Sequence, residues 1–235
     1  MAEQHLALLD AAIAHHGPDG LVTELRVCVQ LAQRERAIFV LSAMVRIADV
    51  NDKVALSRAG AAPIIIDALA ARPRDELVVS AGLCALSRCS EDESDAQTTR
   101  LVVQSAIDAI GRHANLMVHQ AALRLLKRHA LGNHNLMMAP EVIEAVLHAT
   151  RAFPADDTVQ FWAAQAAIGF CSIEPHQVVS THGQSGFDRL SQAAIAIAVA
   201  APRPVEFLIR GQPWTEVIFT LYPRLRSQTQ APAAQ

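Results

Sequence analysis

The stretch that decides the fold runs from Arg34 to Arg74 and reads RERAIFVLSAMVRIADVNDKVALSRAGAAPIIIDALAARPR. It holds apolar segments that are separated by polar residues and by a glycine. We expect a helix, a loop, a short turn at Ala59-Gly60 and a second helix opened by Pro63. Glycine marks turns, and proline is tolerated in the first turn of a helix.

The same pattern recurs to about residue 201. Four segments align at spacings of 42, 40 and 42 residues, and they end at Arg46, Arg88, Arg128 and Phe170. A second segment recurs with them, as Ile66-Asp67-Ala68-Leu69, Ile107-Asp108-Ala109-Ile110, Ile143-Glu144-Ala145-Val146 and Phe187-Asp188-Arg189-Leu190. A period near 40 residues is typical of helical solenoids, in which each repeat packs on its neighbours. The sequence therefore predicts an all-α solenoid of about four repeats, at 34–74, 75–115, 116–155 and 156–201.

The N-terminal segment, residues 1–33, is expected to form a helical cap or partial repeat. Apolar residues at three- and four-residue steps predict amphipathic helices over about 3–16 and 20–32, the second with Leu21, Leu25, Cys28 and Leu31 on one face. Gly17-Pro18-Asp19-Gly20 is expected to break the two helices apart. Terminal repeats are usually atypical because their outer side faces water.

Beyond the repeats, residues 202–226 are expected to form a C-terminal capping segment and helix, and 227–235 a disordered tail. Within the repeats, Asp156-Asp157 precedes an apolar segment and is expected to cap a helix. The acidic loop 90–95 should do the same for a helix that begins near Thr98.

Composition excludes several classes of protein. The net charge of −3 is too small to indicate nucleic acid as a partner. The longest apolar segment, 193–201, is too short to span a bilayer, and residues 1–16 lack the pattern of a signal peptide. We expect a cytoplasmic protein that binds neither membrane nor nucleic acid. No CxxC pair is present, so reduced core thiols are expected at Cys28, Cys84, Cys89 and Cys171.

Two motifs, Cys84-Ala85-Leu86-Ser87-Arg88-Cys89 and Gly60-Ala61-Ala62-Pro63, resemble those of armadillo repeats. The resemblance covers roughly residues 34–201. HEAT repeats are a similar family and the alternative to armadillo repeats. The armadillo resemblance implies a right-handed superhelix of three-helix repeats whose third helices line a concave groove. Members of the family mostly act as scaffolds and peptide-binding proteins rather than as enzymes.

In peptide-binding armadillo proteins an Asn of the first motif faces the groove. The matching positions here are Arg46, Arg88, Arg128 and Phe170, and Arg124 lies one helical turn before Arg128. Four residues earlier, where the family has a groove Trp, the chain has Ser42, Cys84, Arg124 and Ala166. Guanidinium groups suit carboxylates and phosphates. The resemblance thus implies an acidic or phosphorylated extended peptide bound by Arg46, Arg88, Arg124, Arg128, Ser42, Phe170 and Trp162.

Two other interpretations stay open. Arginine near a helix C-terminus also interacts favourably with the helix dipole and the last carbonyls, so the row could serve only as capping. The chain could also be a structural subunit of a multiprotein or cytoskeletal complex that docks through an outer helical face. For Trp162, packing between repeats is favoured over a place in the groove.

Catalytic and metal-binding motifs would indicate an enzyme. The sequence has no HExxH, GxSxG, P-loop or dinucleotide-binding motif. Its ten His are scattered, and we expect them to be exposed helix ends or capping donors. The expectation is a protein that is not an enzyme and has no cofactor and no metal site.

Overall fold

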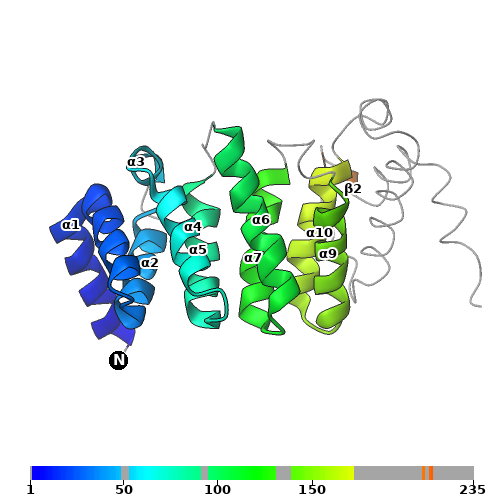
Figure 1. The fold of residues 1–235 in the computed structure, drawn as a ribbon. Coiled ribbons are helices and arrows are strands. Elements are labelled where there is room, and N and C mark those ends of the chain that lie inside the picture. Colours follow the sequence, from blue (N-terminus) through cyan, green and yellow to red (C-terminus); the bar gives the residue numbers. More distant parts are fainter. Residues whose placement is uncertain are drawn as a thin grey trace, which may run out of the picture. The chain divides into compact units, whose positions relative to one another are not determined.

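The computed structural model describes residues 2–48, 53–90, 95–130, 139–171, 208–209 and 212–213. These residues fold almost entirely into helices that pack against one another (Figure 1), which confirms the all-α class. A two-residue antiparallel pair is the exception, with Leu208 opposite Pro213 and Ile209 opposite Gln212. The chain divides into two compact units, Met1–Leu125 and Leu126–Gln235.

The first unit contains six helices among the described residues: α1 (Ala2–Gln30), α2 (Arg34–Ile47), α3 (Lys53–Arg58), α4 (Ala61–Ala71), α5 (Glu76–Cys89) and α6 (Ala96–Arg112). The helix α7 (Leu116–Ala130) begins in the first unit and ends in the second. The second unit continues with α9 (Pro140–Ala152), α10 (Asp157–Cys171), β1 (Leu208–Ile209) and β2 (Gln212–Pro213).

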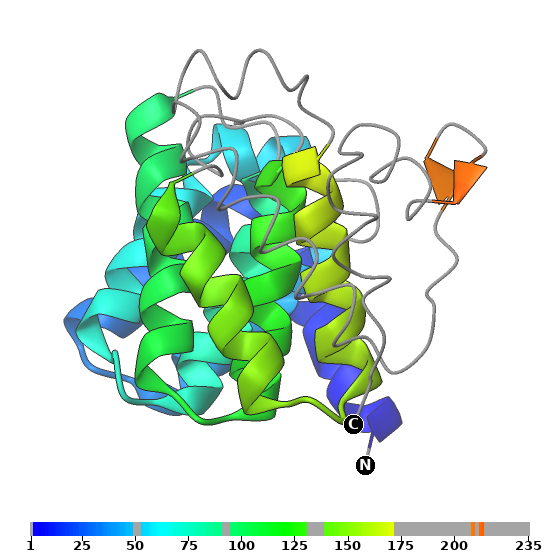
Figure 2. The same ribbon diagram turned by 90° about the vertical axis from the view of Figure 1, so that its right-hand side faces the viewer.

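Short turns join the helices in pairs. Residues 31–33 join α1 to α2, 72–75 join α4 to α5, 113–115 join α6 to α7, and 153–156 join α9 to α10. In the first unit, α1 contacts α2 and α4, α2 contacts α5, and α4 contacts α5 and α6. In the second unit, α9 and α10 lie side by side in both Figure 1 and Figure 2.

The predicted break in the N-terminal helix is confirmed at Gly17. Its backbone has φ 61° and ψ −176°, a conformation that essentially only glycine adopts, and it kinks α1 into two segments. After the kink, Leu21, Leu25 and Cys28 are buried as expected. The prediction for Leu31 was wrong: it lies in the turn that follows α1, and it is 63% exposed because the helix ends before its side chain can reach the core.

Helix starts follow the local chemistry of the sequence. Asp156 caps α10, with its Oδ1 2.7 Å from the amide of Val159, and Asp157 is the first helical residue. Asp95 likewise accepts from the amides of Gln97 and Thr98, so α6 begins at Ala96 rather than near Thr98. Pro140 opens α9 as expected.

The turn predicted at Ala59-Gly60 is confirmed. Gly60 has φ 73° and precedes α4, which begins two residues earlier than the predicted Pro63. The left-handed conformation lets the chain reverse there without the steric penalty that a Cβ would cause.

The core of the first unit is built from aliphatic side chains and close helix approaches. The largest fully buried side chains there are Leu21, Leu25, Leu41, Met44, Leu56, Ile65, Leu83, Leu86, Ile110, Leu123 and Leu125. Cys28 and Cys89 are free and buried, which confirms them as core thiols, whereas Cys84 is half-buried. The Cys171 side chain lies outside the described part of the structure.

Several predictions fall outside the described residues. These are the tail 227–235, the end of the fourth repeat after Cys171, and most of the capping segment 202–226. None of the helices in the described part of the chain combines the length and the apolar character needed to span a bilayer.

Candidate functional site

The arginines predicted to bind a ligand lie at equivalent ends of three helices. Arg46, Arg88 and Arg128 each lie in the last turn of their helix, in α2, α5 and α7 respectively. This is also the position at which a cation is favoured by the helix dipole. The position of these three arginines is therefore expected both for ligand binding and for helix capping.

Arg46 already binds a carboxylate. Its Nε lies 2.5 Å from Oδ1 of Asp10, and its Nη2 lies 3.0 Å from Oδ2 of the same residue. Both side chains are partly exposed, and the hydrogen bond from Arg46 lowers the pKa of Asp10 below its ordinary value. A guanidinium that meets both oxygens of a carboxylate forms the two-point geometry that is strongest for this pair.

Arg88 and Arg124 both lie near the half-buried thiol of Cys84. Burial raises the pKa of this thiol, and the positive charges of Arg124 and Arg88 oppose that rise. The charges of two predicted arginines of the first unit, one on α5 and one on α7, thus act on the same thiol.

The remaining predicted site residues have varied surroundings. Ser42 is half-buried, and its hydroxyl donates to the carbonyl of Ile38 in its own helix at 2.8 Å. Trp162 is half-buried in α10 and packs edge-to-face on Phe161, with ring centroids 4.9 Å apart. Arg128 is half-buried in the part of α7 that belongs to the second unit, and the Phe170 side chain lies outside the described part.

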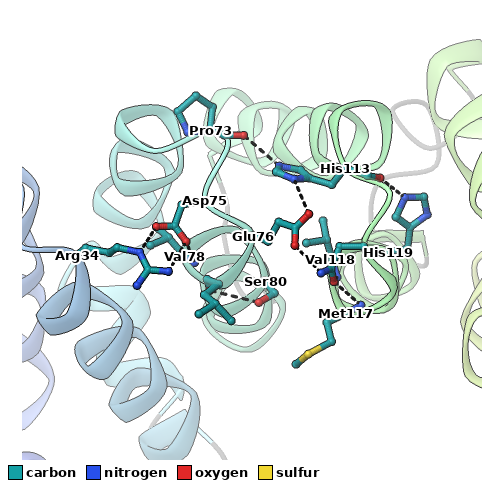
Figure 3. Close-up of polar contacts among 12 residues, drawn as sticks. Arg34, Pro73, Asp75, Glu76, Val78, Ser80, His113, Met117, Val118 and His119 are labelled. Carbon is teal, nitrogen blue, oxygen red and sulfur yellow. Dashed lines mark hydrogen bonds and ion pairs between the residues drawn. The ribbon is translucent and has the colours of Figure 1, made fainter.

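A second set of polar residues, which sequence reasoning missed, links the turns of successive helix pairs (Figure 3). Arg34 bonds the carboxylate of Asp75 through Nε and, at 3.2 Å, through Nη2. The Asn115 amide donates to Oε2 of Glu76 at 2.6 Å, and these two contacts span 41 and 39 residues. That separation matches the period of the sequence repeat.

Two further contacts reinforce the same turns. Arg72 donates to the carbonyl of Ala32, and the buried ring of His113 lies with Nε2 3.0 Å from the carbonyl of Pro73. Each again spans 40 residues. We call this set of contacts the turn ladder, and it is made by Arg34–Asp75, Arg72–Ala32, His113–Pro73 and Asn115–Glu76.

The buried rings of His113 and His119 form hydrogen bonds with backbone carbonyl groups. Because a carbonyl can only accept, Nε2 of His113 carries a hydrogen, and so does Nε2 of His119, which lies 2.7 Å from the carbonyl of His113. These two rings are therefore capping donors, as expected, but they are buried rather than exposed. Within the described ranges, no group of three or more His, Cys, Asp or Glu side chains is arranged to hold a metal ion.

Two hollows open beside the turn between α4 and α5. The larger, of about 960 Å³, is lined by Ile66, Leu69, Ala70, Pro73, Arg74, Glu76, Val79, Ser105, Asp108, Ala109, Arg112 and His113. The smaller, of about 530 Å³, is lined by Arg34, Arg74, Asp75, Glu76 and Leu77. Arg74 and Glu76 line both, so the two hollows adjoin at these residues.

Comparison with models of known protein families, with curated proteins and with solved structures finds no match to this chain. Function must therefore be argued from these side chains and their geometry.

Proposed function

We propose that this chain is a non-catalytic interaction scaffold of armadillo-like repeats that binds an extended acidic or phosphorylated peptide. The proposed site is the arginine face, which we define as Arg46, Arg88 and Arg124, with Arg128 following on α7. The observation that carries the proposal is the bidentate contact between Arg46 and Asp10. In it, one of the predicted arginines already binds both oxygens of a carboxylate.

The environment of Cys84 supports an anionic ligand at the next two arginines. The positive charges of Arg88 and Arg124 both act on this half-buried thiol. A carboxylate or phosphate that docks on this face would be attracted by both guanidinium groups. Phosphate carries more charge and more acceptor oxygens than a carboxylate, so it should bind more tightly here.

The turn ladder supports the repeat architecture in this proposal. Its contacts join backbone and side chains 39 to 41 residues apart, so equivalent turns of successive helix pairs lie side by side in the first unit. A regular stack of this kind presents one side chain per repeat at a regular spacing. An extended peptide, whose side chains also recur regularly, is the ligand that such a surface fits.

The chemistry of the described cysteines supports a binding role rather than catalysis. Burial raises the pKa of Cys89 to about 12 and also raises the pKa of Cys84, so neither thiol is ionised near neutral pH. The free, buried thiols of Cys28 and Cys89 also support a reducing, cytoplasmic compartment.

The test is peptide binding measured by fluorescence anisotropy. Acidic, phosphorylated, basic and neutral peptides of equal length would be compared on the wild type and on an Arg88→Glu/Arg124→Glu variant. The matched control is Arg100→Glu, an exposed arginine on α6. We expect phosphorylated and acidic peptides to bind best, binding to weaken as salt rises, and only the double variant to lose about tenfold or more in affinity.

Equal binding of all four peptides, or equal loss in the Arg100→Glu control, would show that the arginine face is not the site. Circular dichroism of each variant would establish that helicity is unchanged.

A further inference from the structure

Exposed apolar side chains recur at the helix-pairing turns of the first unit. Five large apolar side chains are at least 40% exposed among the described residues, and three of them lie at the turns that pair the helices: Leu31, Leu77 and Met117, at 63%, 51% and 61%. Leu77 and Met117 are each the second residue of their helix, in α5 and α7. Isolated exposed apolar residues are normal, but equivalent positions in successive helix pairs are not scattered.

We call this surface the turn edge, and it consists of Leu31, Arg74, Leu77, Met117 and the two hollows that adjoin at Arg74 and Glu76. The larger hollow has an apolar floor, since Leu69, Val79 and Ala109 are buried there, and the smaller one is bordered by Leu77. We call the turn that carries Arg74 the ridge, and both hollows adjoin it.

Most charges beside the turn edge are already paired within the chain. Arg34 pairs with Asp75, Glu76 accepts from Asn115, and Arg112 pairs with Asp108 at 2.7 Å. Arg74 differs, because it is exposed and makes no hydrogen bond or ion pair with any residue that the structure describes. The ridge therefore offers a cation that pairs with no carboxylate of the described residues.

Hydrogen bonds within the chain also hold the ridge in place without a partner. Arg72 and Pro73, directly before Arg74, are anchored to the neighbouring helix pairs through Ala32 and His113 (Figure 3 shows the Pro73–His113 contact). A surface that is ordered in advance loses less conformational entropy on binding.

We propose that the turn edge is a second docking surface, separate from the arginine face, for a protein segment that combines apolar side chains with a carboxylate. The apolar side chains enter the hollows and contact Leu77 and Met117, and the carboxylate pairs with Arg74. The hollows favour a protein segment over a lipid surface, since they take up individual side chains. Charges of both signs stand side by side in Arg34-Glu35-Arg36 and in Arg74-Asp75-Glu76, whereas anionic lipid attracts clusters of positive charge.

The experiment uses the full chain and short synthetic peptides as probes. One peptide alternates Leu with Glu, a second alternates Leu with Lys, and a third alternates Ser with Glu. Binding would be measured by anisotropy for the wild type, Leu77→Asp and Arg74→Gln. The matched controls are Leu101→Asp, at a position that is 46% exposed on α6, and Arg100→Gln on the same helix.

The Leu/Glu peptide is expected to bind the wild type and both controls equally. Arg74→Gln should weaken it several-fold, and Leu77→Asp should weaken it about tenfold or more, because a charge replaces an apolar contact at the centre of the surface. The Leu/Lys peptide should bind poorly. Any binding of the acidic Ser/Glu peptide should belong to the arginine face, so it should not change in Leu77→Asp or Arg74→Gln. Absence of Leu/Glu binding, or equal loss in Leu101→Asp, overturns the proposal.

Three further measurements distinguish this proposal from other binding sites and other occupants. The Arg88→Glu/Arg124→Glu variant should retain Leu/Glu binding, and loss there would assign the peptide to the arginine face instead. Sedimentation velocity that shows a wild-type dimer dissociated by Leu77→Asp would identify a second copy of the chain as the occupant. Binding to vesicles of anionic lipid that is lost in Leu77→Asp would identify a membrane. Each of these three results would overturn the assignment of a separate protein segment.

Discussion

Arg46 near the end of α2 binds Asp10 of α1 by a two-point fork, with nitrogen–oxygen distances of 2.5 and 3.0 Å. Asp10 lies before the kink at Gly17, in the segment of α1 whose described side chains are mostly exposed. The contact spans 36 residues and joins the N-terminal helix to the first arginine of the arginine face. A carboxylate of the chain itself thus occupies the position that the proposed ligand would need.

Replacing Asp10 by Asn should therefore strengthen binding of acidic peptides to the arginine face. The variant removes the internal charge that competes for Arg46, so we expect affinity to rise by about three- to tenfold. Anisotropy titrations of the same acidic peptide would measure it, with Asp19→Asn, also exposed on α1, as the control. Unchanged or weaker binding in Asp10→Asn would separate Arg46 from the ligand site.

Gly82→Ala should destabilise the first unit. A Cβ at this position would lie 2.5 Å from Cδ2 of Leu69, so α4 and α5 would have to move apart or Leu69 would have to leave its rotamer. Overpacking of this kind costs about 1–3 kcal/mol in the free energy of unfolding in urea, and the higher helix propensity of Ala offsets about 1 kcal/mol of that cost. Gly111→Ala on α6 is the control, since nothing lies within 4 Å of its added Cβ and it carries the propensity change without the overpacking. Gly82→Ala should therefore be less stable than Gly111→Ala, and equal stability of these two variants would contradict the close helix approach.

The Arg34–Asp75 pair should make stability depend on acidity. A hydrogen bond from Arg34 lowers the pKa of Asp75 in the folded protein, and burial opposes this only in part. The pair therefore contributes fully above the pKa of Asp in the unfolded chain, about 3.9, and the contribution is lost as the pH falls through the lower folded pKa.

Asp75→Asn tests this while preserving the helix cap, because Asn caps helices as well as Asp does. The difference in unfolding free energy between wild type and variant should shrink as the pH falls from about 7 to about 3. Asp67→Asn, an exposed position on α4, provides the comparison. A difference that stays constant over that range would mean that the charge of Asp75 contributes nothing.

Asp156→Ala should cost more than Asp157→Ala. The Oδ1 of Asp156 accepts the Val159 amide at 2.7 Å and so satisfies one of the free donors at the start of α10. Loss of such a cap costs about 1 kcal/mol, whereas a first-turn acid contributes about 0.3–1 kcal/mol at most. Thermal unfolding of the two variants and of Asp156→Asn would show the order, and Asp156→Asn should stay close to wild type. The reverse order for the two alanine variants would assign the cap to Asp157.

How much of the site could be predicted follows from the range of each interaction. The row of arginines at helix ends is visible as a period in the sequence, because a repeat places equivalent residues at equivalent positions. Asp10 as the partner of Arg46 was not predictable, since no rule of spacing joins residues 36 apart in different helices. The turn ladder was missed for the same reason, although its separation of 39 to 41 residues agrees with the repeat.

The sequence by itself determined the helical class, the break at Gly17, the turn at Gly60 and the caps at Asp95 and Asp156. All of these depend on backbone conformation and on hydrogen bonds within a few residues. Only the tertiary structure decided that Leu31 is exposed, that Arg88 and Arg124 share the surroundings of Cys84, and that two hollows adjoin Arg74. These depend on how helices distant along the chain pack, because burial and electrostatic surroundings are properties of neighbours in space.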